Sequence, residues 1–162
     1  VMENQTFRPV GAKEEIKVCA HLIVGLPGEG LGHFLKTIEF INNLPVQAVK
    51  FHNLYVARDT ELARMWEMGQ VKLLGEDEYV QWLVQGLERL RPDIVVQRLN
   101  GDAAQGELLA PAWAAQKSHL LQRILDSLEE RQTWQGNLLR PVELAPPHFH
   151  PDHDSRSLRP FS

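Results

Sequence analysis

Residues that could bind a ligand or do chemistry lie at the ends of two apolar segments of the chain: glycines after the first, and a histidine and a tyrosine near the end of the second. The first segment, residues 18–24, ends at a turn made of Gly25, Leu26, Pro27 and Gly28. The second, residues 48–56, carries His52, Leu54 and Tyr55 near its end. Barrel enzymes bind ligands at the carboxyl ends of parallel strands, glycine lets the backbone approach a ligand, and histidine titrates near neutral pH. A plain tight turn and a hydrogen-bonded core histidine are the alternatives.

Two further sets of polar residues are candidates for chemistry. Arg98 and Asp102 bracket a turn, where they could contact a substrate or form a surface ion pair that contributes little. His21 lies in the middle of the first apolar segment and is expected to pack or to bond locally. A histidine and aspartate cluster near the end of the chain is made of His148, His150, Asp152 and His153. Its spacing fits no closed metal site, so we expect at most a weak adventitious one.

The elements that must position these residues follow from apolar spacing. Residues 18–24 form an apolar run without strict alternation, which suits a strand buried on both faces of a parallel sheet. Apolar residues at helical spacing over 31–44 predict a helix that Pro45 ends, and 48–56 predict a second strand. A strand, a helix and a strand within this length predict a βαβ unit with parallel strands.

The remainder of the chain is predicted to be mainly helical. We expect a short helix over 59–68, and a longer one that begins at Gly75 with Glu78 in capping-box position. A third strand over 93–99 and a helix over 111–131 follow. The composition from residue 137 onward is typical of a disordered tail.

Composition excludes some classes of function. The chain has 162 residues and a formal net charge of −4, which gives no indication of nucleic-acid binding. Its apolar runs are too short to span a membrane and its first residues show no signal-peptide pattern, so a cytoplasmic location is expected. Its single cysteine, Cys19, cannot form an internal disulfide or a multi-cysteine metal site.

Ordered sequence blocks resemble one family along most of the chain. Residues 21–29 resemble the fifth-strand GLPGE motif of radical S-adenosylmethionine (SAM) enzymes. Further blocks resemble the YhcC-like branch of that family in its VKIHLLH, GTxLA, EEYV, HRLTGD, APxW and RRDSWQG segments, and they lie at residues 49–55, 59–63, 78–80, 96–102, 109–113 and 131–136.

This resemblance implies an α/β fold, the C-terminal part of a partial (β/α)6 TIM-like barrel with a helical C-terminal extension. It implies a [4Fe-4S] cluster, SAM and a 5′-deoxyadenosyl radical in the complete protein, with an unknown substrate. It also implies that SAM would pass close to Gly25, Leu26, Pro27, Gly28, His52, Leu54 and Tyr55, with Arg98 and Asp102 toward the substrate.

The chain departs from the family pattern in ways that limit the prediction. The family holds its cluster with a CxxxCxxC-type motif after the first barrel strand, and one thiol cannot replace those ligands. No cluster, and therefore no metal, is expected in this chain alone. Gly30 stands where the family has Thr or Ser, which leaves the start of the following helix open.

The predicted organisation is an irregular segment over 1–15, the last βαβ part of a barrel over 16–72, an extension over 73–136 and a disordered tail over 137–162. Two functions follow from it. The chain is a C-terminal fragment of a radical SAM enzyme whose first half is lost or encoded separately, or it is a non-catalytic module. Such a module would complement a cysteine-bearing partner or self-associate through an open sheet edge. A SAM-binding protein without a cluster is a third, weaker reading.

Overall fold

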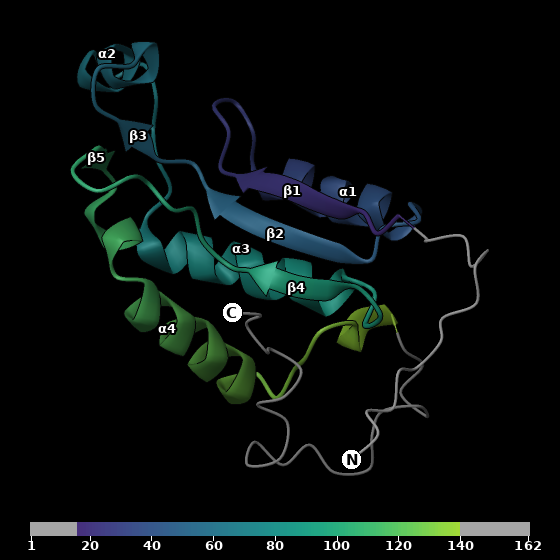
Figure 1. The fold of residues 1–162 in the computed structure, drawn as a ribbon. Helices are drawn as coiled ribbons and strands as arrows, with labels where there is room; N and C mark the ends of the chain where they lie inside the picture. Colours follow the sequence, from purple (N-terminus) through teal and green to yellow (C-terminus); the bar gives the residue numbers. More distant parts are fainter. Residues whose placement is uncertain (1–15, 140–162) are drawn as a thin grey trace, which may run out of the picture.

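The computed structural model describes residues 16–139. Three parallel strands form its central sheet in the order β1-β2-β4: β1 (Cys19–Val24), β2 (Ala48–Asn53) and β4 (Val95–Arg98). Strand β1 pairs with β2 without interruption from Cys19 opposite Ala48 to Val24 opposite Asn53, and β4 pairs with the other edge of β2. The predicted α/β class and parallel pairing are confirmed, and the carboxyl ends of the strands share one edge (Figure 1).

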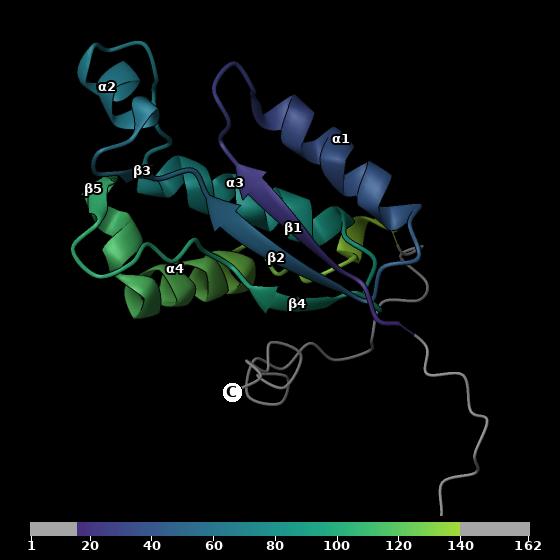
Figure 2. The same cartoon turned by 45° about the horizontal axis from the view of Figure 1, so that its top comes forward.

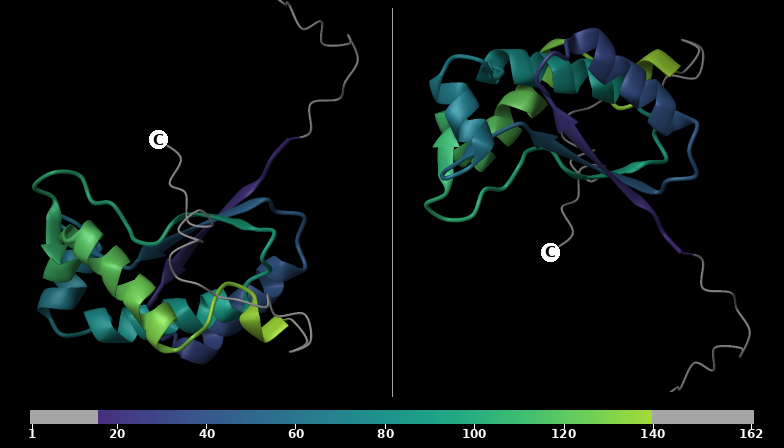
Figure 3. Two further views of the ribbon diagram at one scale, coloured as in Figure 1. Left: turned by 90° about the horizontal axis from the view of Figure 1, so that it is seen from below. Right: turned by 90° about the horizontal axis from the view of Figure 1, so that it is seen from above.

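One face of this sheet is covered by helices. Helix α1 (Leu31–Asn42) and helix α3 (Glu76–Arg89) pack against each other, and α4 (Lys117–Glu130) packs against α3. Figures 2 and 3 show these three helices on the same side of the sheet. The core between the layers includes Val49, Phe51, Ile38, Leu83 and Leu87, which are almost inaccessible to solvent. Burial of such side chains contributes about 1.5–3 kcal/mol each.

A second, smaller layer lies beyond the carboxyl ends of the strands. The short strand β3 (Val56–Ala57) pairs antiparallel with β5 (Leu108–Ala110), next to helix α2 (Glu61–Glu67). The second strand was predicted as one unit over 48–56, but it is divided. The backbone N–H of Leu54 still donates to the carbonyl of Val24 at 2.9 Å, and the chain then enters the other sheet as β3.

Helix starts follow local backbone chemistry. Helix α1 begins after an extended Gly30, whose N–H donates to Nδ1 of His33 at 3.1 Å. His33 thus supplies the N3 half of a capping box, whereas Gly30 has no side chain to supply the half expected of a Thr or Ser. Helix α3 begins after Gly75 as predicted, but no side chain caps it, because glycine offers no side-chain acceptor for a capping box. Acidic residues in its first turn favour this end of the helix dipole, and they are Glu76, Asp77 and Glu78.

The helix predicted over 111–131 is broken in two. Residues Ala112–Ala115 form the 3₁₀ turn η1, and Gln116 takes a non-helical backbone conformation before α4 begins. The cause is that two segments pack in different places. Trp113 packs on Tyr79 with ring centres 5.1 Å apart and donates to the carbonyl of Leu74 at 3.2 Å, whereas α4 packs along α3.

The structure differs from the predicted segment boundaries in two places. Strand β4 comes from the segment predicted as an extension, 73–136, yet it pairs with β2 in the central sheet. Residues Asn137–Leu139, at the start of the segment predicted as a disordered tail, form a second 3₁₀ turn, η2. Residues 1–15 and 140–162, with the histidine cluster at 148–153, lie outside the described residues. No helix within 16–139 is long and apolar enough to cross a membrane.

Candidate site at the carboxyl edge of the sheet

The glycine turn after β1 lies beside a cavity. Gly25 and Gly28 have φ values of +88° and +79°, in the left-handed region that glycine adopts without a Cβ penalty. A cavity of about 380 Å³ opens next to the turn, and residues 25–30, residues 70–74, Glu78 and Trp82 line it. The turn therefore presents backbone to a space that a ligand group could enter.

The two glycines of this turn differ in what surrounds them. A Cβ built on Gly25 would lie 2.9 Å from Cγ and Cδ1 of Leu74, whereas a Cβ on Gly28 would meet nothing within 4 Å. The C-terminal segment holds Leu74 in place, because the Trp113 indole donates to its carbonyl. Gly25 is thus packed inside the protein, and Gly28 is the glycine of the pair that is open to a ligand.

The end of β2 is tied to the turn after β4. Asn53 is 3% exposed, and its Oδ1 accepts a hydrogen bond from the backbone N–H of Gly101 at 2.8 Å. A Cβ on Gly101 would lie 3.1 Å from Cδ1 of Tyr55, so this approach requires a small residue. Leu54 and Tyr55 are half-buried here. Sequence reasoning missed Asn53 and Gly101, although a lone asparagine inside an apolar strand end is a signal that its side chain has a buried partner.

The opposite face of the sheet carries imidazoles. His21 of β1 and His52 of β2 stack with ring centres 5.3 Å apart and planes 16° from parallel. Alternation places them away from Leu22 and Phe51, which are buried on the helix-covered face. His52 was predicted as a site residue. His21 was expected to pack or to bond locally, and it packs on that residue as a stacked pair.

The surroundings of His52 disfavour its protonation. Burial, followed by electrostatic repulsion from His21, Arg98 and Lys50, lowers the pKa of His52 below its ordinary value. Its Nε2 atom is buried and has no hydrogen-bond partner within the described part of the chain. The imidazole is therefore held in its neutral form near neutral pH.

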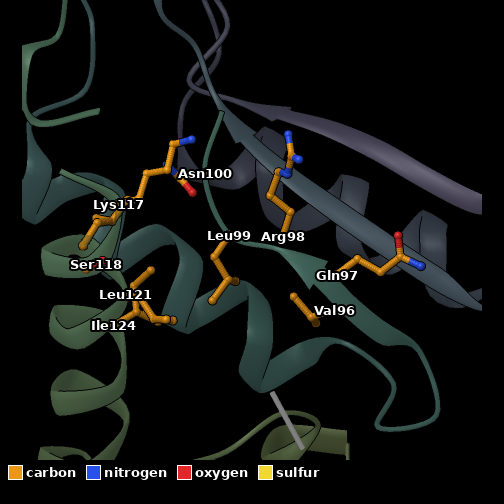
Figure 4. Close-up of a pocket in the computed structure, with 10 residues that line it drawn as sticks. Val96, Gln97, Arg98, Leu99, Asn100, Lys117, Ser118, Leu121 and Ile124 are labelled. Carbon is orange, nitrogen blue, oxygen red and sulfur yellow. The ribbon is translucent and has the colours of Figure 1, made fainter. Parts of the chain in front are cut away.

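Arg98 and Asp102 do not pair directly with each other. Asp102 forms its ion pair with Lys117 at the start of α4, and the hydrogen bond from that ammonium group lowers the pKa of the carboxyl. Both partners are about half exposed, so this pair contributes little to stability. Arg98 borders a groove of about 250 Å³ between β4 and α4, and Figure 4 shows its side chain pointing in the opposite direction from those of Val96 and Leu99. The charge of Arg98 nevertheless also lowers the pKa of Asp102, so the two predicted substrate residues lie within electrostatic range of each other without pairing.

The residues present do not fit an iron–sulfur cluster. Cys19 stands at the amino end of β1, and its Sγ lies 3.6 Å from Oε1 of Gln97, six residues along the chain from the Gly25 turn. In the range 16–139, no three His, Cys, Asp or Glu side chains come together where they could hold a metal ion. The turn and the strand ends, in contrast, offer backbone and half-buried apolar groups suited to part of a nucleoside-like ligand.

A parallel α/β sheet with helices on one face and a glycine turn at its carboxyl edge defines part of a barrel of the radical SAM type. Residues 46–130 match the Radical_SAM C-terminal domain, and the chain belongs to that family. The matched region includes β2, β4, α3 and α4.

Relatives support the same assignment. The chain is 33% identical over 131 residues to the uncharacterized protein YtqA of Bacillus subtilis, covering 81% of this chain and 41% of that one. It is 33% identical over 125 residues to MJ0486 of Methanocaldococcus jannaschii, covering 76% and 39%. It is 34% identical over 98 residues to YhcC of Escherichia coli K12, covering 60% and 32%. The chain therefore spans about two fifths or less of the length of these relatives.

A solved structure shares the fold. The archaeal Elp3 of Methanocaldococcus infernus, with an N-terminal deletion, superposes with a TM-score of 0.62 at 20% identity. The match covers 74% of this chain and 28% of that one. The predicted YhcC-like membership and the partial barrel fold are confirmed by these similarities.

Proposed function

We propose that this chain forms the C-terminal part of a radical SAM enzyme and supplies one side of its SAM site. The complete protein would bind a [4Fe-4S] cluster and cleave SAM reductively to a 5′-deoxyadenosyl radical. The cluster cysteines would come from polypeptide outside these 162 residues, either a continuation of the chain or a separate subunit. By itself the chain would then be inactive.

The observation that carries this proposal is the open Gly28 turn beside its cavity, next to the end of β2. Backbone groups around Gly28 would contact SAM, with Leu26 and Pro27 shaping the wall. His52, Leu54 and Tyr55 would line the adenine side, since β1 and β2 end together at Val24 and Asn53. We also propose that the complete enzyme is located in the cytoplasm.

Complementation tests this function. The chain would be reconstituted anaerobically with iron and sulfide, alone and mixed with the cysteine-bearing first part of a YtqA-type barrel. We expect a [4Fe-4S] absorption band in the mixture, and 5′-deoxyadenosine formation from SAM there but not with the chain alone. Gly28→Val should abolish product formation, because its side chain would fill the open side of the turn, and Lys36→Gln on the outer face of α1 is the control.

Two results would contradict the proposal. A cluster band from the chain alone would show that the residues present suffice to hold the cluster. An unchanged rate of product formation in Gly28→Val would show that the turn does not face SAM. The DNA upstream of the codon for Val1 offers a cheaper test, because an in-frame or shifted CxxxCxxC segment there would support the fragment interpretation.

The free edge of β1 favours a second candidate function, a non-catalytic subunit. Among the described strands, β1 pairs only with β2, so its other edge is free. Ile23 in β1 and Val18 just before it are 49% and 46% exposed. An edge of this kind favours pairing with another chain. Light scattering after size-exclusion chromatography distinguishes the candidates: a stable complex that binds neither cluster nor SAM would favour the subunit.

A further inference from the structure

The central sheet has one face that no described helix covers. Helices α1, α3 and α4 all lie on the other side (Figure 3). On the uncovered face, alternation along β1 and β2 places His21, Lys50 and His52, none of which is buried. The same face would point into the barrel if the proposed function holds, so the inference below rests on that proposal for its biological setting.

Two cations, Lys50 and Arg98, and two imidazoles, of His21 and His52, converge on this uncovered face from all three strands. The register pairs His21 with Lys50, and Lys50 with Arg98 on the far side of β2. A register irregularity between Val49 and Lys50 brings Arg98, rather than Gln97, opposite Lys50. His21, Arg98 and Lys50 each repel the protonated form of His52, which confirms that all of them lie within electrostatic range of that ring.

This cationic cluster, made of His21, Lys50, His52 and Arg98, has no carboxylate bonded to it within residues 16–139, although Arg98 acts on the Asp102 carboxylate through its charge without a direct bond. No carboxylate acts on His52, and no described residue forms a hydrogen bond or an ion pair with the side chains of the cluster. Several other cations of the chain behave differently, because Lys117 pairs with Asp102 and Arg123 pairs with Asp77. Unpaired like charges on adjacent strands repel each other unless an anion lies between them.

We propose that the cationic cluster is an oxyanion site that binds the carboxylate or phosphate group of the substrate. Arginine offers a planar set of donors that matches such groups, and lysine adds a point charge. The stacked imidazoles supply ring N–H donors at the same face. The cluster therefore selects an anionic substrate.

The oxyanion is assigned to the substrate rather than to SAM, because the proposed SAM contacts include His52, on the adenine side, but neither Lys50 nor Arg98. The cavity beside the glycine turn is lined by residues 25–30 and 70–74 with Glu78 and Trp82, and by no member of the cationic cluster. Two carboxylates, of Glu29 and Glu78, and one ammonium group, of Lys72, lie in that lining, so its net negative charge disfavours an anion there. The cluster lies on the strands themselves, before the turn.

Titration of the whole chain with inorganic phosphate tests the site without any cluster or cofactor. The imidazole resonances of His21 and His52 would be followed by NMR while phosphate replaces chloride at constant ionic strength. We expect saturable shifts of both rings with phosphate, and affinity about tenfold weaker in Arg98→Gln, as expected for loss of a hydrogen bond to a charged group. Lys50→Gln should weaken binding in the same direction.

A matched control and a competition arm make the test decisive. Lys36→Gln removes one exposed positive charge from α1, on the other face of the molecule, and should leave phosphate affinity unchanged. Circular dichroism would establish that each variant is folded. Equal shifts with chloride, or equal weakening in Lys36→Gln, would overturn the site. SAM added at the phosphate concentration should leave the phosphate affinity unchanged, even if it shifts the His52 resonance from the adenine side. A weaker apparent phosphate affinity would assign the oxyanion to SAM and overturn the substrate assignment.

These results are separable from those of the proposed function. Phosphate binding can fail while the chain still completes a cluster-bearing barrel and forms 5′-deoxyadenosine. Conversely, the complementation can fail while phosphate still binds to the cationic cluster.

Discussion

The side-chain oxygen of Asn53 accepts a hydrogen bond from the backbone N–H of Gly101 across 48 residues of sequence, at 2.8 Å. This bond joins the end of β2 to the turn that follows β4, at the edge where the glycine turn also lies. The bond is buried, so neither group can form a hydrogen bond with water instead. The geometry of the carboxyl edge thus depends on a polar contact inside the protein.

Replacing Asn53 by alanine should destabilise the chain. The N–H of Gly101 would remain buried without an acceptor, which costs about 1–3 kcal/mol. Urea unfolding monitored by circular dichroism measures this change. Asn43→Ala is the control, because Asn43 bonds to Glu39 on the exposed end of α1 and its loss should cost about 0.5 kcal/mol or less. Equal losses for the two variants would contradict the role of Asn53.

Alanine at Gly25 should cost more than alanine at Gly28. Both positions have positive φ, so each substitution adds about 1–2 kcal/mol of backbone strain. At Gly25 the new methyl group also meets Leu74 at 2.9 Å, which adds about 1–3 kcal/mol of overpacking. Urea unfolding of both variants gives the difference.

A double-mutant cycle identifies the source of that difference. Leu74→Ala in the Gly25→Ala background should recover part of the loss, since the two side chains would no longer overlap. Additive effects of Gly25→Ala and Leu74→Ala would show that the contact is not the cause.

Two helical glycines should respond to alanine with opposite signs. A Cβ on Gly86 of α3 would lie 2.7 Å from Cε1 of Phe34 in α1, so Gly86→Ala should destabilise the chain by about 1–3 kcal/mol. A Cβ on Gly32 of α1 would meet nothing within 4 Å, so Gly32→Ala should stabilise it by up to about 1 kcal/mol through helix propensity. Thermal unfolding measures both, and stabilisation by Gly86→Ala would refute the close approach of α1 and α3.

His52 of the cationic cluster should make the free energy of unfolding depend on pH. The pKa of His52 is lowered in the folded protein, so below about pH 6.5 the unfolded chain binds this proton more readily than the folded one. The contribution of His52 is therefore present above its unfolded pKa and is lost as the pH falls. His52→Gln should reduce the loss of unfolding free energy between neutral and mildly acidic pH, measured in urea.

NMR titration of the imidazoles resolves the physical causes. Arg98→Gln and Lys50→Gln should each raise the pKa of His52, because each removes a repelling charge, but the value should stay below the ordinary one because burial is the largest cause. Lys36→Gln is the control and should leave this pKa unchanged. A His52 pKa above the ordinary histidine value in the unmodified chain would contradict the arrangement.

Much of this protein follows from its sequence. Apolar spacing is a local property, so residues 18–24, 31–44 and 75–90 could be assigned to a strand and two helices whose structural bounds differ by a few residues. The glycine turn and the ordered blocks identified the family, and the single cysteine predicts that this chain alone holds no cluster. Such features depend on residue type and order.

Tertiary structure alone decided which residues meet. The irregular register of β2 and β4 set Arg98 opposite Lys50, and the docking of α4 gave Asp102 an ion pair with Lys117. Arg98 and Asp102 therefore do not pair directly, although they lie within electrostatic range. Stacking brought His21 to His52, and the burial of Trp113 broke a helix whose apolar spacing was continuous. These outcomes depend on contacts between segments far apart in the chain, where local spacing carries no information.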